Sequence, residues 1–95
     1  MTMVVTRDVE NRYRGFLTSV MLEIAPGVYV APNFSKGIRR RVWNVISSWY
    51  SVLGRGAIVM VWRDGTQPGN LAIKTLGEQP KQIVNAGNIL LVKRN

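Results

Sequence analysis

The sequence predicts one α+β domain in which an antiparallel sheet carries two helices on one face. Three observations lead to this class: two segments with apolar residues at helical spacing, several short β-branched runs of strand length, and turns rich in glycine or proline between them. The chain has 95 residues, roughly 0.6 of an average domain, so we expect a single domain over residues 1–95. A core this small also favours association of two copies.

The first half of the chain predicts a strand, a helix and a hairpin. Residues 1–6 are apolar and β-branched, which is typical of a buried strand. Asp8 suits a helix N-cap, with Glu10 in the first turn. Apolar residues then recur at three- and four-residue steps, at Val9, Tyr13, Phe16, Leu17, Val20 and Met21. Pro26 and Gly27 separate residues 23–25 from residues 28–30 and predict a tight hairpin, although the helix could extend to Glu23.

The second half predicts a longer helix and three strands. Asn33 and Ser35 can cap the helix, and Gly54 with Gly56 ends it. Its predicted apolar face comprises Ile38, Val42, Val45, Ile46, Trp49, Val52 and Leu53. Residues 57–62 form a continuous apolar run, residues 63–65 turn the chain, and residues 71–76 read as the antiparallel partner. Pro80 interrupts the path, and residues 89–92 predict a last strand.

This order corresponds to the ferredoxin-like βαββαβ plan with an extra C-terminal strand. Two helices cover only one face of such a sheet. Apolar residues at Val59, Val61, Leu71 and Ile73 therefore need another cover, and the face-to-face packing of two sheets in a homodimer would supply it.

The charge and the residue types of the chain limit the classes of function that it can have. Thirteen Lys and Arg against five Asp and Glu give a net charge of +8, which favours a polyanionic partner such as nucleic acid. The chain has no Cys and no His, which excludes thiolate zinc sites, cysteine nucleophiles and a Ser-His-Asp triad. Apolar runs are far shorter than the ~20 residues of a membrane span, and no signal peptide is recognisable, so we expect a cytoplasmic protein with no membrane partner.

Basic residues gather at the starts of both predicted helices. Arg12 and Arg14 flank the buried stripe while Tyr13 points inward, so the two arginines can straddle a phosphate backbone, and Gly15 permits close approach. The alternative is a solvated helix face. At the second helix Lys36, Arg39 and Arg40 are candidates to bind DNA. Three consecutive arginines at 39–41 point in three directions and at most two can address one ligand, so a solvated helix face is the favoured alternative there.

Asp8 is the carboxylate placed at the end of the first strand. Paired with its copy across a homodimer axis it could hold Mg²⁺ or Mn²⁺ and act catalytically; the alternative is a helix N-cap. Trp43, Trp49 and Trp62 could stack on bases, but Trp49 and Trp62 lie on apolar stripes, where core packing is favoured.

An ordered set of short motifs gives the chain a family resemblance. The set comprises Val4-Val5-Thr6, Arg12-x-Arg14-Gly15, Leu22-Glu23, Gly27-Val28-Tyr29-Val30, Ile38 with Trp43 and Ile46, Met60-x-Trp62 and Thr75-x-Gly77. In this order the sequence resembles the small CRISPR-associated adaptation protein of type I-E systems, the second of the two universal adaptation subunits.

The resemblance implies a ferredoxin-like homodimer at the centre of a complex with the integrase subunit, two integrase dimers flanking it. Such a complex captures a short double-stranded DNA and inserts it into the CRISPR array as a new spacer. The resemblance further implies that Arg12 and Arg14 lie on the duplex backbone and that Lys81 corresponds to part of a basic pair. It assigns integrase pairing by β-augmentation to a strand at about residues 88–93, with Ile89, Leu90, Leu91 and Val92.

One position departs from relatives described as metal-dependent nucleases. They carry an acidic residue at the end of the first strand, where an ungapped alignment places Arg7 and leaves Asp8 one residue later, on the other face of the strand. We therefore expect a non-catalytic DNA scaffold. The alternatives are a metal-dependent endonuclease acting on single-stranded RNA or double-stranded DNA, and a single-stranded RNA-binding module, which would need exposed aromatics absent from residues 3–6.

Overall fold

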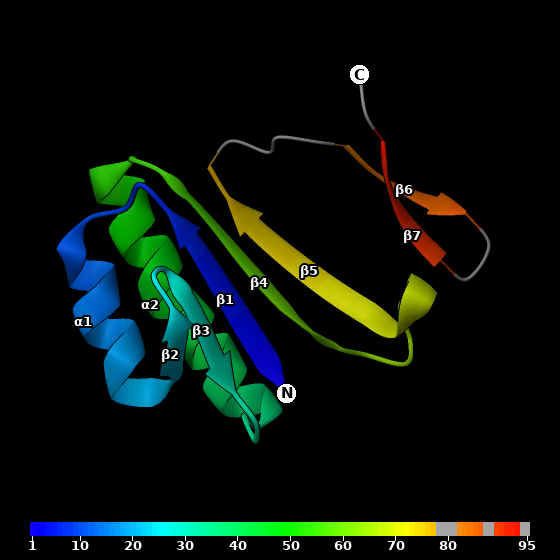
Figure 1. Cartoon of the computed structure of the whole chain (residues 1–95), viewed down its shortest axis with the longest axis horizontal. Coiled ribbons are helices and arrows are strands. Elements are labelled where there is room, and N and C mark those ends of the chain that lie inside the picture. The colour runs from blue at the N-terminus through cyan, green and yellow to red at the C-terminus, as the bar shows by residue number, and fades with distance from the viewer. Residues whose placement is uncertain (78–81, 87–88, 94–95) are drawn as a thin grey trace.

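The computed structural model describes the backbone of residues 1–77, 82–86 and 89–93, and the side chains of residues 1–77. Its elements follow the predicted order (Figure 1). They are β1 (Thr2–Arg7), α1 (Asn11–Val20), β2 (Leu22–Ala25), β3 (Val28–Ala31), α2 (Lys36–Leu53), β4 (Ala57–Arg63), the 3₁₀ turn η1 (Pro68–Asn70), β5 (Leu71–Leu76), β6 (Gln82–Ala86) and β7 (Ile89–Lys93).

The central sheet has five strands in the order β2-β3-β1-β4-β5, and every neighbouring pair is antiparallel. Both helices lie on one face of this sheet (Figure 1). The predicted α+β class and ferredoxin-like arrangement are thereby confirmed, with β5 added at one edge. The strands β6 and β7 form a separate two-stranded sheet, which lies beyond β5 and away from the helices (Figure 1).

The core lies between the helices and the inner face of the sheet. Val4 of β1 and both Ile58 and Met60 of β4 have no exposed surface, and Tyr13 and Leu17 of α1 meet them from the other side. Because side chains alternate along a strand, burying these positions turns their neighbours to the opposite face. The helical layer thus fixes which residues the outer face presents.

The start of α1 differs from the sequence prediction. Asp8 does not cap the helix: its backbone is left-handed, with φ of 55°, and it ends the strand instead. Glu10 is the N-cap, not a first-turn residue, and its side chain makes no capping hydrogen bond. The predicted Asp8 cap is therefore wrong, because the chain uses Asp8 to turn out of β1 before the helix begins at Asn11.

The caps of α2 are as predicted at two of the three positions. The Ser35 hydroxyl accepts a hydrogen bond from the Ile38 amide at 3.2 Å, and Gly54 ends the helix in the left-handed conformation, with φ of 62°. Asn33 is not the N-cap.

The apolar face of α2 is rotated from its predicted position. Val42, Trp43 and Ile46 are buried, whereas Ile38 is 46% exposed and Val52 is 82% exposed. Residues seven apart lie on one line of a helix, and the line through these two exposed residues runs along a flank rather than against the sheet. The Val20 side chain of α1 is likewise exposed.

The predicted hairpin at Pro26 and Gly27 joins β2 to β3. Gly27 has φ of 77°, and a Cβ there would lie 2.8 Å from the Thr6 carbonyl oxygen, so the turn requires glycine. At the other end of the chain the sequence missed one element, since β7 pairs in antiparallel fashion with a strand that was not predicted, β6. Within the described parts of the chain, no helix is long and apolar enough to cross a membrane.

Candidate nucleic-acid interface

Two arginines of α1 point to opposite sides of a buried tyrosine. Tyr13 has no exposed surface, and its ring meets Trp49 of α2 edge-on, with 5.7 Å between ring centroids. The Arg12 guanidinium carbon lies 5.4 Å from the Trp49 ring centroid, an arrangement that stabilises a cation over an aromatic face. Arg12 is exposed, so its guanidinium is oriented by Trp49 and still open to solvent.

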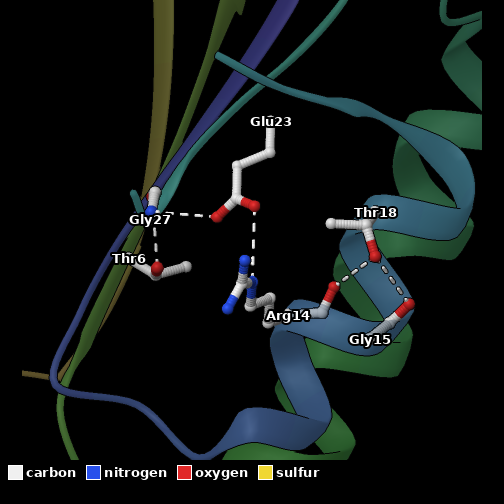
Figure 2. Close-up of polar contacts among 6 residues, drawn as sticks. All are labelled: Thr6, Arg14, Gly15, Thr18, Glu23 and Gly27. Atoms are coloured by element: carbon white, nitrogen blue, oxygen red, sulfur yellow. Dashed lines mark hydrogen bonds and ion pairs between the residues drawn. The ribbon is translucent and has the colours of Figure 1, made fainter. Parts of the chain in front are cut away.

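Arg14 extends in the other direction, toward the β2–β3 hairpin. Its Nε donates to Glu23 Oε1 at 3.3 Å, and the Gly27 amide donates to Glu23 Oε2 at 3.2 Å (Figure 2). The Glu23 side chain is 18% exposed, whereas that of Arg14 is 69% exposed. Glu23 therefore ties α1 to the hairpin while much of the guanidinium remains in solvent. The predicted outward placement of Arg12 and Arg14 around an inward Tyr13 is confirmed.

A hollow of about 580 Å³ opens beside this ion pair, between the hairpin and the β1–α1 connection. Its lining includes three carboxylates, from Asp8, Glu10 and Glu23, but one cationic side chain, that of Arg14. Burial raises the pKa of the Tyr29 hydroxyl, which also lines the hollow, and the charge of Glu23 raises it further. The side chains that line the hollow carry net negative charge and would repel an anion, so the exposed outer side of the two arginines is the candidate phosphate-binding surface.

A second basic group lies at the start of α2. Lys36, Arg39 and Arg40 line a cavity of about 130 Å³ together with Lys74 of β5. The remaining walls are Trp43, Met60, Trp62 and Asp64. Arg41 does not line it, in agreement with the expectation that three consecutive arginines cannot all address one ligand.

Sequence reasoning missed Lys74 and the role of Trp62. The Arg39 guanidinium carbon lies 4.5 Å from the Trp62 ring centroid, so this tryptophan orients a cation rather than only filling core. The alternation of side chains along β5 could have indicated Lys74 from the sequence. In the structure Lys74 pairs with the buried Met60 and therefore lies on the helix-facing side of the sheet. Of the three tryptophans, Trp43 is the one that belongs to the buried core, at 9% exposure.

Asp8 lies at the end of β1 with its side chain 75% exposed. The same guanidinium, that of Arg55, contacts both neighbouring carboxylates: Arg55 Nη2 is 3.6 Å from Asp8 Oδ1, and Arg55 Nη1 is 3.1 Å from Glu10 Oε1. Arg55 Nε also donates to the Asp8 carbonyl oxygen at 3.2 Å.

These contacts bear on the predicted metal site. A divalent cation needs several oxygen ligands, and the Arg55 guanidinium already pairs with both carboxylates at this position. Across the residues whose side chains are described, 1–77, no group of three or more carboxylates forms a candidate metal site. Within one copy of the chain, the residues around Asp8 therefore do not fit Mg²⁺ or Mn²⁺.

The outer face of the sheet is apolar, as predicted. Val59 and Val61 of β4 alternate with the buried Ile58 and Met60, so they lie on the face opposite the helices. Val5 of β1 is 37% exposed on this face. The register adds further apolar residues to the same face: Met3, Val28, Val30, Leu71 and Ile73.

A comparison with known families identifies the class of protein. Residues 1–91 match the family model described as "CRISPR-associated protein (Cas_Cas2CT1978)". The chain belongs to this family. The match covers β1 to β5 with both basic groups, and it places the CRISPR-associated protein in CRISPR systems.

Some predicted site residues of this CRISPR-associated protein fall outside the described structure. Lys81 lies outside the described residues. Ile89, Leu90, Leu91 and Val92 lie in β7, of which only the backbone is described. β7 pairs with β6 along one edge, and its pairing with an integrase stays a prediction.

Proposed function

We propose that this CRISPR-associated protein is a spacer-acquisition subunit of a type I-E system: a homodimeric scaffold that binds a foreign DNA duplex by its backbone and bridges integrase dimers. The observation that carries the proposal is the arrangement of Arg12 and Arg14. Each is exposed, and each is oriented by a partner on another element, Trp49 for Arg12 and Glu23 for Arg14. Oriented guanidinium groups suit phosphate oxygens, which offer no sequence information, so binding should tolerate any sequence.

Charge beyond α1 supports the same partner. The net charge is +8, and Lys36, Arg39 and Arg40 supply a second group of contacts. Lys81 is proposed as a further DNA contact on the family resemblance alone.

Dimerisation is proposed to use the outer face of the sheet. A face of valines with Leu71 and Ile73, over which no helix of the described residues lies, is costly to leave in water, and a second copy offers an identical apolar surface across a two-fold axis. In the integrase complex, β7 would add to a partner's sheet, because a strand paired on one edge can accept another on its second edge.

The second candidate, a metal-dependent endonuclease using Asp8 with Mg²⁺ or Mn²⁺, is the weaker one. Arg55 pairs with Asp8 and with Glu10, so a divalent cation would have to displace its guanidinium, and Arg7, next to Asp8 in the sequence, adds a further positive charge.

Fluorescence anisotropy with a labelled duplex tests the proposal. Log affinity should fall linearly with log salt, and replacing both Arg12 and Arg14 by alanine should reduce the slope by about 0.9 per lost phosphate contact, or about 1.8 for each protomer that contacts the duplex. Arg41→Ala is the matched control, because Arg41 is exposed on α2 and lines neither hollow. A double variant that binds like the control would refute the proposal, and metal-dependent cleavage lost in Asp8→Ala would establish the endonuclease instead.

A further inference from the structure

We infer that the cavity between the start of α2 and β5 is a discrete phosphate-binding site, formed by Lys36, Arg39, Arg40 and Lys74 with Trp62 as its wall. The inference deepens the proposed function where the phosphate belongs to DNA. It does not depend on that function where the phosphate belongs to a free compound.

The charge balance of the cavity argues for an anion. Four cationic side chains line it against one carboxylate, that of Asp64. Asp64 Oδ1 already accepts hydrogen bonds from the Thr66 amide at 2.9 Å and the Thr66 hydroxyl at 2.7 Å, so this oxygen serves the turn between β4 and β5. Among residues 1–77, none of the four cations forms an ion pair within 4 Å. A bound anion would relieve their mutual repulsion.

The position of these cations is unfavourable for the fold itself. Lys36, Arg39 and Arg40 occupy the first five residues of α2, whose first turn contains no acidic residue. The positive end of the helix dipole lies here, and this end normally carries Asp or Glu. Cations placed against that preference are better explained by a ligand than by helix stability.

The geometry favours phosphate among anions. Trp62 covers one face of the Arg39 guanidinium at 4.5 Å, which leaves the planar edge of N–H donors free to form paired hydrogen bonds with phosphate oxygens. Trp43 and Met60 close the apolar side of the cavity. Its volume of about 130 Å³ suits one small anionic group rather than a groove-filling chain.

The site is separate from the α1 arginines. The Thr6 amide donates to the Gly27 carbonyl, next to Glu23, so Thr6 marks the position of the α1 site along β1. Trp62 of the second site pairs with Thr2, at the other end of the same strand. Four residues of extended strand separate the two positions, about 13 Å at ~3.3 Å per residue. Successive phosphates of one DNA strand advance about 3.4 Å along the helix axis, so the two sites would contact different phosphates.

Two probes distinguish the source of the phosphate. The variants are Arg39→Gln and Lys74→Gln, which remove charge but keep bulk, with Arg41→Gln as the matched control on the same helix. The first probe is a labelled DNA duplex, measured across a salt series. If the site holds a backbone phosphate, each variant should weaken binding about tenfold and lower the salt slope by about 0.9, while the control does neither. The second probe is inorganic pyrophosphate, followed by tryptophan fluorescence because Trp62 and Trp43 line the cavity.

Each outcome has a definite meaning. A duplex effect confined to Arg39→Gln and Lys74→Gln supports the site and assigns it to DNA. A fluorescence change with pyrophosphate that Arg39→Gln abolishes supports the site even if wild-type protein binds no duplex, a result that would refute the proposed function alone. The inference is overturned if both variants match Arg41→Gln with both probes, whether or not the Arg12 and Arg14 variants lose DNA binding.

Discussion

Glu23→Gln separates the structural and electrostatic roles of the carboxylate that holds Arg14. The native carboxylate accepts from Arg14 Nε at 3.3 Å and from the Gly27 amide at 3.2 Å. The two donors bind different oxygens of the carboxylate, and glutamine keeps one of these oxygens and places an NH₂ donor at the other, so one of the two donors loses its acceptor. The Arg14 pair is largely exposed and contributes little, whereas the part-buried Gly27 amide loses a charged acceptor. We expect the free energy of unfolding to fall by about 1–2 kcal/mol, which lowers the Tm by about 4–8 °C for each kcal/mol.

The same substitution should strengthen DNA binding. A phosphate on the outer side of the Arg14 guanidinium would lie about 7 Å from the Glu23 carboxylate, and removing that repulsion in a water-like dielectric gains about 0.6 kcal/mol. This corresponds to about threefold tighter binding at low salt, fading as salt screens the charge.

The assay is duplex anisotropy at low and high salt, combined with thermal unfolding of each variant. Glu10→Gln is the control, because Glu10 pairs with Arg55 rather than with an α1 arginine. The gain should vanish when Arg14 is alanine. An unchanged or weaker affinity in Glu23→Gln, or an equal gain without Arg14, would show that Glu23 does not attenuate this contact.

Three further predictions concern stability and assembly. Gly56→Ala should lower the free energy of unfolding in urea by about 2–3 kcal/mol or more, because φ is 84° and a Cβ would overlap carbonyl oxygens at the end of β1. Gly15→Ala, with nothing within 4 Å of the added Cβ, should raise it by about 0.5–1 kcal/mol. Equal effects of the two substitutions would contradict the backbone argument. Burial raises the pKa of Tyr13 and Tyr29 above the ordinary 10.0, so the stability that they contribute is complete below about pH 10 and declines as pH rises through the higher folded pKa. Absorbance titration at alkaline pH should show both hydroxyls ionising at higher pH in the folded protein than in urea. Coincident titration curves would refute this prediction. Val61→Asp should convert a dimer to a monomer in sedimentation experiments, and a variant that stays dimeric would exclude the outer sheet face as the interface.

The elements were predictable where local pattern is enough. Apolar spacing, the Ser35 cap and the hairpin glycine act over a few residues, and the structure confirms the strands and helices that they predict. The predicted helix cap at Asp8 is wrong, because the connection from strand to helix first makes a turn at Asp8 and the helix begins three residues later, at Asn11. It also missed β6, since residues 82–86 lack the continuous apolar run that marks other strands of this chain.

Features of the candidate site that depend on local pattern were likewise predictable, and those that depend on distant contacts were not. The sequence by itself determined the fold class, the outward placement of Arg12 and Arg14 around Tyr13, and the apolar outer face of the sheet, because these depend on the repeat of a helix or strand. Only the tertiary structure decided what each cation faces. Arg55 contacts Asp8, which lies 47 residues earlier in the sequence, and the Arg39 guanidinium lies over the ring of Trp62 on another element. Such pairs form only after the helices pack on the sheet. Local periodicity fixes the face on which a residue lies, whereas its neighbours on that face are set by how distant segments pack.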